Sequence, residues 1–260
     1  MPDELVHLAV AGGVATITLD SPHNRNALSR QLVSELDQRL DAALADDNAR
    51  VIVLTHEGPA FCAGADLKEQ RSANESQQPG ATRVDLPAIL MKMWNAPKPV
   101  LGRLSGPARA GGIGLVAACD IAVAADTVTF AFSEVRIGVV PAVISVVVVP
   151  KIGEPKAMEL FLTGDTIDAQ TAAGIGLINR AAPADGLDDA VGQYLDSLLK
   201  GGPNALGGCK QLVRDVPKLS MEEGFREMSD RSAAFFASEE AREGMTAFAE
   251  KRPPSWVTGG

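Results

Sequence analysis

GPARAGGIGLVAACD, residues 106–120, combines clustered glycines with an apolar run that carries no charge between Arg109 and Asp120. Glycines at the start of a helix allow another group to approach the backbone closely. Their spacing here fits neither the dinucleotide fingerprint G-x-G-x-x-G nor a phosphate-binding Gly-Lys-Ser loop. Taken alone, the cluster is more typical of close helix packing than of a binding site.

The segments before residues 106–120 alternate between predicted strands and helices. Residues 5–10 and 14–19 show alternating apolar side chains on either side of two glycines, which predicts a hairpin. A helix is expected from Ser29, the predicted N-cap, followed by a buried strand at 51–54. Further predicted elements are a polar loop at 70–83, a helix at 86–94, and strands at 98–104, 120–125 and 128–132. This order predicts an α/β architecture with right-handed crossovers.

The end of the chain has a different pattern. From about residue 188 it is predicted to be helix after helix, including one helix over 219–241 with an apolar stripe. Glycine and proline cluster near residue 200, so we predict a core at 1–199 and a C-terminal helical region at 200–260.

Composition excludes several classes of protein. With 260 residues and 46% apolar residues, the chain can bury a full core. Its net charge of −9 disfavours nucleic-acid binding, and no apolar run reaches the length of a membrane span. The N-terminus shows no signal segment, so a cytoplasmic location is expected. Three distant cysteines, Cys62, Cys119 and Cys209, indicate neither a disulfide framework nor a metal site, and we expect them to be small core residues.

Two glycine-bearing stretches follow predicted strands, at 59–69 (PAFCAGADLKE) and 106–115. Each can direct backbone N–H groups from the end of a strand, which is how an oxyanion hole is built. The three histidines lie in no nucleophile motif and no G-x-S-x-G occurs, so a serine or cysteine triad is not expected.

Five ordered motifs, from AFCAGADLKE at 60–69 to REGMTAFAEKRPP at 242–254, resemble the enoyl-CoA hydratase/isomerase, or crotonase, superfamily. The resemblance spans about residues 5–254. It implies a spiral of repeated ββα units, a C-terminal helical region used in trimerisation, and a homotrimer or a hexamer made of two trimers. It also implies an acyl-CoA thioester substrate, with the N–H groups of Ala65 and Gly111 as the oxyanion hole.

The resemblance further implies acid–base carboxylates, of which this chain has one. Glu134, fourteen residues after Asp120, matches the second glutamate of the hydratase pattern. The first glutamate would fall at position 114, where this sequence has Gly114. A glutamate beside an apolar pocket binds its proton more strongly and can act as acid or base near neutral pH.

The family places the coenzyme A arm along two stretches of this sequence. Arg25 and Lys68 are candidates for its phosphates, although a solvated position is an equal alternative for each. Arg109 could meet an acidic acyl tail, but we expect it to point to solvent. No metal, nicotinamide or flavin is implied, because coenzyme A enters as part of the substrate. The remaining candidate substrate-binding residues are Ala27, Ala63, Asp66, Leu67 and Gly112, with Asp66 expected to hold backbone geometry or line the channel rather than to perform catalysis.

The leading hypothesis is therefore a hydratase that adds water to a short or branched 2-enoyl-CoA. Residues 111–125 and 133–145 resemble the methylglutaconyl-CoA hydratase-like branch, which also has glycine at the position of Gly114. A Δ3,Δ2-enoyl-CoA isomerase is the alternative enzyme, because one carboxylate suffices for a proton shift. A non-catalytic acyl-CoA-binding protein is the third hypothesis.

Overall fold

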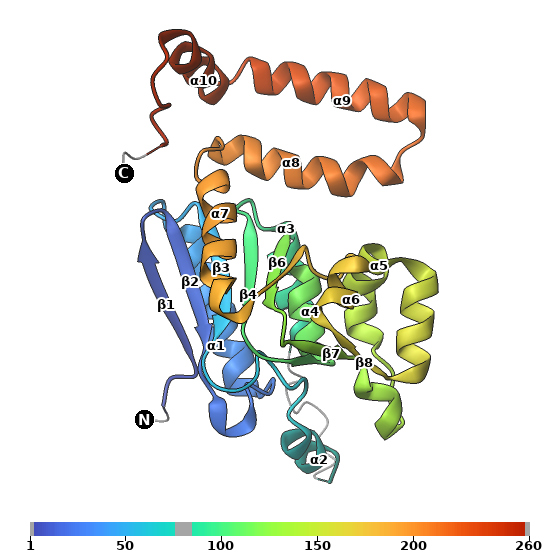
Figure 1. Cartoon of the computed structure of the whole chain (residues 1–260). Helices are drawn as coiled ribbons and strands as arrows, with labels where there is room; N and C mark the ends of the chain where they lie inside the picture. The colour runs from blue at the N-terminus through green and yellow to red at the C-terminus, as the bar shows by residue number, and fades with distance from the viewer. Residues whose placement is uncertain (1–2, 76–84, 258–260) are drawn as a thin grey trace.

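The computed structural model describes residues 3–75 and 85–257 and contains one large sheet of six strands (Figure 1). Strand β1 pairs antiparallel with β2, and every later pair in this sheet is parallel. Full burial of all six residues of β3 explains its uninterrupted apolar run, because helices cover both faces of a parallel sheet. The strand order is β1 (Val6–Ala11), β2 (Val14–Leu19), β3 (Val51–His56), β4 (Val100–Leu104), β6 (Ile121–Ala125) and β9 (Arg180–Ala182).

A second, smaller sheet lies beside the first and contributes to the site. Its order is β5 (Ala108–Arg109), β7 (Thr129–Ala131) and β8 (Thr166–Asp168). The chain passes from β4 in the large sheet to β5 in the small one, and again from β6 to β7. These repeated crossings between two sheets, each followed by a helix, form the expected spiral of ββα units.

Helices surround the sheets, and most of the helices predicted from the sequence are present in the structure. The side chain of Ser29 accepts a hydrogen bond from the Leu32 N–H and caps the first helix as expected. The helices are α1 (Arg30–Ala45), α2 (Leu67–Glu75), α3 (Leu86–Asn95), α4 (Gly111–Ala118), α5 (Ala142–Thr163), α6 (Ala169–Gly174), α7 (Leu187–Leu198), α8 (Pro203–Asp215), α9 (Met221–Phe236) and α10 (Glu239–Glu250).

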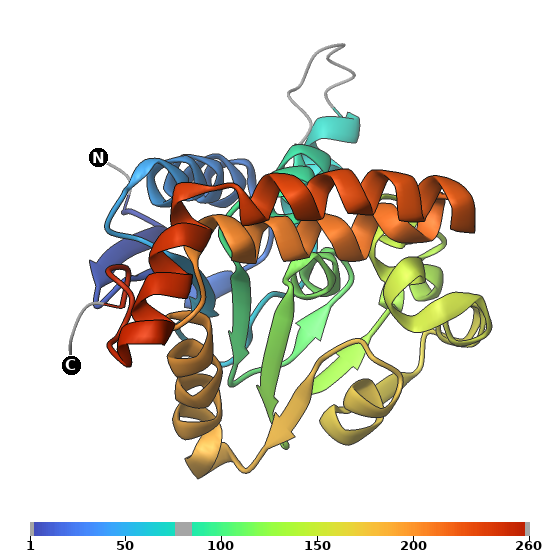
Figure 2. The ribbon, with the colours of Figure 1, turned by 90° about the horizontal axis from the view of Figure 1, so that it is seen from above.

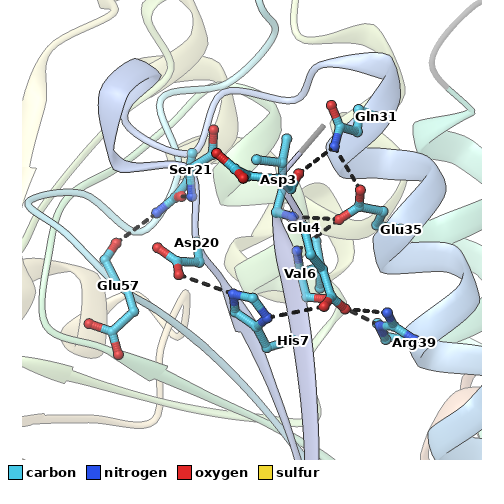
Figure 3. Close-up of polar contacts among 12 residues, drawn as sticks. Asp3, Glu4, Val6, His7, Asp20, Ser21, Gln31, Glu35, Arg39 and Glu57 are labelled. Atoms are coloured by element: carbon cyan, nitrogen blue, oxygen red, sulfur yellow. Dashed lines mark hydrogen bonds and ion pairs between the residues drawn. The ribbon is translucent and has the colours of Figure 1, made fainter. Parts of the chain in front are cut away.

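Polar contacts fasten α1 to the first strand of the sheet (Figure 3). The carboxylate of Glu35 accepts hydrogen bonds from the backbone N–H groups of Leu5 and Val6, at 2.6 and 3.0 Å. Arg39, one turn further along α1, donates to the Val6 carbonyl at 3.1 Å and pairs with Glu4. These bonds satisfy an edge-strand backbone that would otherwise be open to another chain.

Helix α5 resolves a conflict between local propensity and topology. Residues 143–149 are rich in valine, which favours strands. The structure places them in α5, as the family resemblance implied, because Ile144, Val147 and Val148 are buried against the core there. Gly153, with φ of 75°, interrupts the helical backbone of α5 between Pro150 and Pro155.

The C-terminal helices lie across one end of the large sheet, with α9 running alongside α8 (Figures 1 and 2). Gly208 on α8 makes this approach possible, because a Cβ there would lie 2.4 Å from the ring of Phe235 on α9. Arg50 links this region to the sheet by donating to the carbonyls of Leu199, Gly201 and Trp256. The division into 1–199 and 200–260 coincides with the turn between α7 and α8 and stays a prediction.

Three local expectations are wrong. The single helix over 219–241 is two helices, because α9 ends at Phe236 and Ser238 caps α10. Within the polar stretch predicted as a loop, residues 70–75 belong to α2, whose carboxylate cap Asp66 starts the helix; residues 76–83 lie outside the described residues. Cys209 is exposed on α8, whereas Cys62 and Cys119 are buried as expected.

Within residues 3–75 and 85–257, no helix is both long and apolar enough to span a bilayer.

Candidate active site

A cavity of about 660 Å³ brings the three predicted catalytic residues together. Ala65 reaches it from the loop after β3, Gly111 from the start of α4, and Glu134 from the 3-10 helix Ser133–Ile137. The other residues that line the cavity were not predicted from the sequence, and most of them are apolar. These further lining residues are Leu28, Gln70, Asp85, Leu86, Pro87, Ala110, Val139, Val140, Pro141, Ala142, Val143 and Ile144.

The two glycine-bearing stretches lie against each other at the edge of this cavity. The Arg109 N–H donates to the Cys62 carbonyl at 2.9 Å, which joins the second stretch to the first. Gly64 has φ of 89°, and a Cβ at this position would lie 2.8 Å from the Cβ of Ala110 and 3.5 Å from the Gly111 nitrogen. Gly64 is therefore required both for its backbone conformation and for the close approach of the two stretches.

The N–H groups of Ala65 and Gly111 have no hydrogen-bond acceptor among the residues that the structure describes. Gly111 is the first residue of α4, where N–H groups have no partner within the helix and the helix dipole favours negative charge. The preceding Ala110 has φ of 49° and ψ of −122°, an unusual conformation for a residue with a side chain. Two unpaired N–H donors at one cavity can bind an oxygen that carries developing negative charge.

Glu134 presents an unpaired carboxylate oxygen. Its Oε2 is buried and has no hydrogen-bond partner among the described residues. Burial raises the pKa of Glu134 above the ordinary glutamate value, because ionisation inside an apolar cavity is disfavoured. An unpartnered buried carboxylate in a cleft is suited to moving a proton to or from a bound molecule.

Gly114, where the resemblance implies a second carboxylate, is enclosed by carbon atoms. A Cβ at this position would lie 2.5 Å from Cγ2 of Ile144 and 3.5 Å from Cδ1 of Leu90. Both neighbours are buried. A glutamate at position 114 would therefore require Ile144 to move, because Ile144 fills the space next to Gly114.

The candidate residues for the coenzyme A arm lie beside the cavity, not inside it. Arg25 and Lys68 are exposed, and the Arg25 carbonyl accepts a hydrogen bond from the Ala63 N–H at 3.0 Å. Leu67 is exposed, Ala63 is half-buried and Ala27 is buried. Asp66 caps α2 by accepting from the N–H groups of Lys68 and Glu69, and it also accepts from Asn24.

Gly112 and Arg109 are not among the residues that line the cavity. Gly112, expected to bind substrate, is buried outside the cavity, and a Cβ there would lie 2.7 Å from the Cβ and carbonyl oxygen of Cys62. Arg109, expected to point to solvent, is half-buried, and its guanidinium donates hydrogen bonds to the carbonyl and Oγ1 of Thr129. Polar atoms of β7 thus hold this guanidinium away from the lining of the cavity.

Other potential nucleophiles near the site have structural roles. Burial raises the pKa of the Cys62 thiol to about 12, so this group stays protonated at neutral pH. His56 accepts hydrogen bonds from the N–H and Oγ of Ser105 at 3.2 and 3.1 Å, and burial lowers its pKa. Among the described residues, no group of three or more His, Cys, Asp or Glu side chains is arranged to hold a metal ion.

Together, these features define a class of site at which two backbone N–H groups can bind an anionic oxygen and one carboxylate can move a proton. The profile of the Enoyl-CoA hydratase/isomerase family matches residues 9–259, and this chain belongs to that family.

Relatives of known sequence and structure cover nearly the whole chain. Enoyl-CoA isomerase/hydratase fer4 of Mycosarcoma maydis is 32% identical over 263 residues, covering 97% of this chain and 94% of that protein. Carnitinyl-CoA dehydratase of Proteus mirabilis is 33% identical over 258 residues, covering 96% and 97%. The crystal structure of an enoyl-CoA hydratase from Shewanella pealeana superposes with a TM-score of 0.91 at 31% identity, covering 97% of this chain and 96% of that one.

Proposed function

We propose that this protein is an acyl-CoA hydratase that adds water to the double bond of a 2-enoyl-CoA thioester. The observation that carries the proposal is the convergence of Glu134 with the unpaired N–H groups of Ala65 and Gly111 on one largely apolar cavity. Membership of a family of enoyl-CoA hydratases and isomerases supports it.

In the proposed reaction, the N–H groups of Ala65 and Gly111 hold the thioester oxygen. Glu134 takes a proton from water as the water oxygen bonds to C3, and the electrons of the C2=C3 bond move toward the thioester oxygen as an enolate. The protonated Glu134 then gives its proton to C2, which regenerates the carboxylate and yields the 3-hydroxyacyl-CoA. Each oxyanion donor lowers the barrier by about 3 to 4 kcal/mol in comparable enzymes. The reaction forms one C–O bond and one C–H bond from water, involves no net oxidation or reduction, and needs no metal or redox cofactor.

A second candidate is a Δ3,Δ2-enoyl-CoA isomerase, and the packing of Ile144 against Gly114 favours it. In that reaction Glu134 removes a proton from C2 of a 3-enoyl-CoA and returns it to C4 of the dienolate. No water is consumed, so one carboxylate suffices.

The test is to mix the purified protein with crotonyl-CoA, 3-methylglutaconyl-CoA and a 3-enoyl-CoA, and to follow the absorbance of the conjugated thioester. Hydration removes this absorbance, whereas isomerisation of the 3-enoyl-CoA creates it. We expect loss with at least one conjugated substrate, and a fall of roughly 10²- to 10⁴-fold in the Glu134→Gln variant, the usual size of a general acid–base contribution.

If absorbance increases with the 3-enoyl-CoA but does not decrease with crotonyl-CoA or 3-methylglutaconyl-CoA, the protein is an isomerase. Binding of acyl-CoA without turnover of any substrate would support the non-catalytic alternative and contradict both enzyme assignments. The preferred conjugated substrate would identify the acyl group, including the methylglutaconyl branch that the sequence resembles.

Coenzyme A is proposed to extend from the oxyanion site past Leu67 toward Arg25 and Lys68. Lys68 lies at the start of α2, three residues after Ala65, and the Arg25 carbonyl accepts from the Ala63 N–H; both cations are exposed. Substitution of either by Ala would then weaken coenzyme A binding in a salt-dependent way, because exposed ion pairs are screened.

We further propose that the C-terminal helices mediate self-association into a homotrimer or a hexamer of two trimers. Large apolar side chains on α9 and α10 face solvent in the single chain, among them Met221, Phe225, Phe236 and Phe248, whose exposed fractions are 69–88%. Exposed apolar clusters of this kind mark interaction surfaces. Sedimentation equilibrium would measure the mass of the assembly, and a monomer at micromolar concentration would contradict this proposal.

A further inference from the structure

The side chain of Ile144 belongs both to the protein core and to the lining of the cavity. Its side chain is only 2% exposed and packs with Leu90 against Gly114, where α3, α4 and α5 meet. It also lines the cavity that contains Glu134, whereas Gly114 itself does not. The side chain of Ile144 therefore lies between Gly114 of α4 and the cavity.

The apolar side chain of Ile144 disfavours a bound water molecule beside it, but it does not hinder proton transfer by the Glu134 carboxylate. Ile144 offers no hydrogen-bond donor or acceptor, so a water molecule resting on it would lose part of its hydrogen bonding. Glu134 retains an unpaired buried oxygen, Oε2, on which a proton or one water can be held. Hydration requires a water placed at C3, and a proton shift between C2 and C4 requires none.

We propose that Ile144 is a specificity-determining residue that sets the balance between hydration and proton shift by excluding water from the side of the cavity next to Gly114. The inference rests on the proposed function, because it assumes that Glu134 acts on an enoyl thioester. It adds a determinant of reaction choice that lies outside the acid–base group itself.

The test compares two rates for each variant: kcat/KM for hydration of a 2-enoyl-CoA and kcat/KM for isomerisation of the corresponding 3-enoyl-CoA. Products are separated and identified by chromatography and mass spectrometry. Ile144→Thr keeps the β-branched shape and adds a hydroxyl group that can hold a water. We expect the ratio of hydration to isomerisation to rise roughly twofold to tenfold, the range corresponding to one added hydrogen bond.

Ile144→Val is the matched control, because it keeps an apolar β-branched side chain and should leave the ratio unchanged. Ile144→Ala provides a second route to the same result, since it opens space for water without adding a polar group to the core. Thermal unfolding of each variant identifies loss of folding, and the ratio of two rates is insensitive to the fraction of active protein.

A variant at the neighbouring position tests the packing argument. Gly114→Glu alone should lower the unfolding temperature and activity, because its Cβ meets Ile144 at 2.5 Å. Combined with Ile144→Ala, the same glutamate should fit and raise the ratio of hydration to isomerisation above that of Ile144→Ala.

The outcomes separate the inference from the function on which it rests. An unchanged ratio in active Ile144→Thr and Ile144→Ala variants would overturn the role of Ile144 and leave the role of Glu134 intact. Lack of turnover of both substrates by the unsubstituted protein, or full turnover by Glu134→Gln, would overturn the proposed function itself.

Discussion

The guanidinium of Arg214 on α8 lies 2.7 Å from the carboxylate of Asp120, which precedes β6 in the large sheet. Asp120 also accepts from Lys210 Nζ and from the Val100 N–H, each at 2.7 Å. Arg214 stacks over the ring of Trp94 at 4.2 Å. One largely buried carboxylate thus connects the C-terminal helices to the sheet that carries the site.

Replacing this carboxylate should destabilise the protein strongly. In Asp120→Ala, two largely buried cations and one backbone N–H lose their partner. Breaking such a network costs about 3–5 kcal/mol. Urea unfolding would measure the change in the free energy of unfolding. Asp165→Ala is the control, because Asp165 and Arg136 form an exposed ion pair with little expected effect. Equal stability of the two variants would contradict the structural role of Asp120.

Glu134 should impose a cost on stability that depends on pH. Its pKa is raised in the folded protein, chiefly by burial, so the folded state holds its proton more strongly than the unfolded chain does. Above the ordinary glutamate value of about 4.3, the unfolded chain ionises more readily, which lowers the free energy of unfolding as pH rises through the folded pKa. Glu134→Gln should therefore be more stable than the parent at pH 7 and show no such gain near pH 4.

The same raised pKa predicts the pH profile of activity. Because the proposed base must be ionised before it takes a proton, kcat/KM should fall as pH decreases through the raised pKa, at a pH above that of an ordinary glutamate. A profile that stays flat down to the ordinary glutamate pKa of about 4.3, together with a less stable Glu134→Gln variant, would show that Oε2 is neither unpaired nor the base.

The close approach of the two oxyanion stretches can be tested at Gly64. Gly64→Ala introduces a Cβ where φ is 89° and where the Cβ of Ala110 would be 2.8 Å away. The loop must shift, and the Ala65 N–H moves with it, so kcat should fall by roughly 10²-fold or more, as for loss of one oxyanion donor. Gly12→Ala is matched for backbone strain, since Gly12 has φ of 57° and an open environment in the hairpin. Its stability should fall while kcat stays near that of the parent.

His56 should make the protein sensitive to mild acid. Burial is the main cause of its lowered pKa, and its Nε2 accepts from the Ser105 N–H, so the folded state binds a proton only weakly. The unfolded chain takes up this proton near pH 6.5. Stability should therefore be complete above about pH 6.5 and decrease as pH falls below it, toward the lowered folded pKa.

Substitution tests this assignment to His56. His56→Gln should flatten the dependence of the free energy of unfolding on pH between 6.5 and 5, measured by urea unfolding at each pH. An identical slope in His56→Gln and the parent protein would contradict the assignment.

Local patterns were sufficient for most of the elements. The cap at Ser29, the hairpin around Gly12, and the strands that alternate with helices follow from residues within a few positions of each other. Boundaries that depend on long-range contacts were harder to predict. The break at Ser238 and the helical state of residues 143–149 depend on packing against distant segments, so local propensity predicted the first incorrectly and favoured a strand for the second.

The sequence by itself determined the family and the ββα order, and it singled out Ala65, Gly111 and Glu134 as candidates, because these features are encoded in short motifs of fixed spacing. It also showed that a carboxylate is missing at Gly114. The structure brings the three candidate residues to one cavity. Only the tertiary structure showed that Ile144 fills the space next to Gly114. It also showed that Arg109 donates to Thr129 and that Gly112 packs on Cys62. Such outcomes depend on which side chains from distant segments fill the same volume, and close packing of the interior decides this in three dimensions.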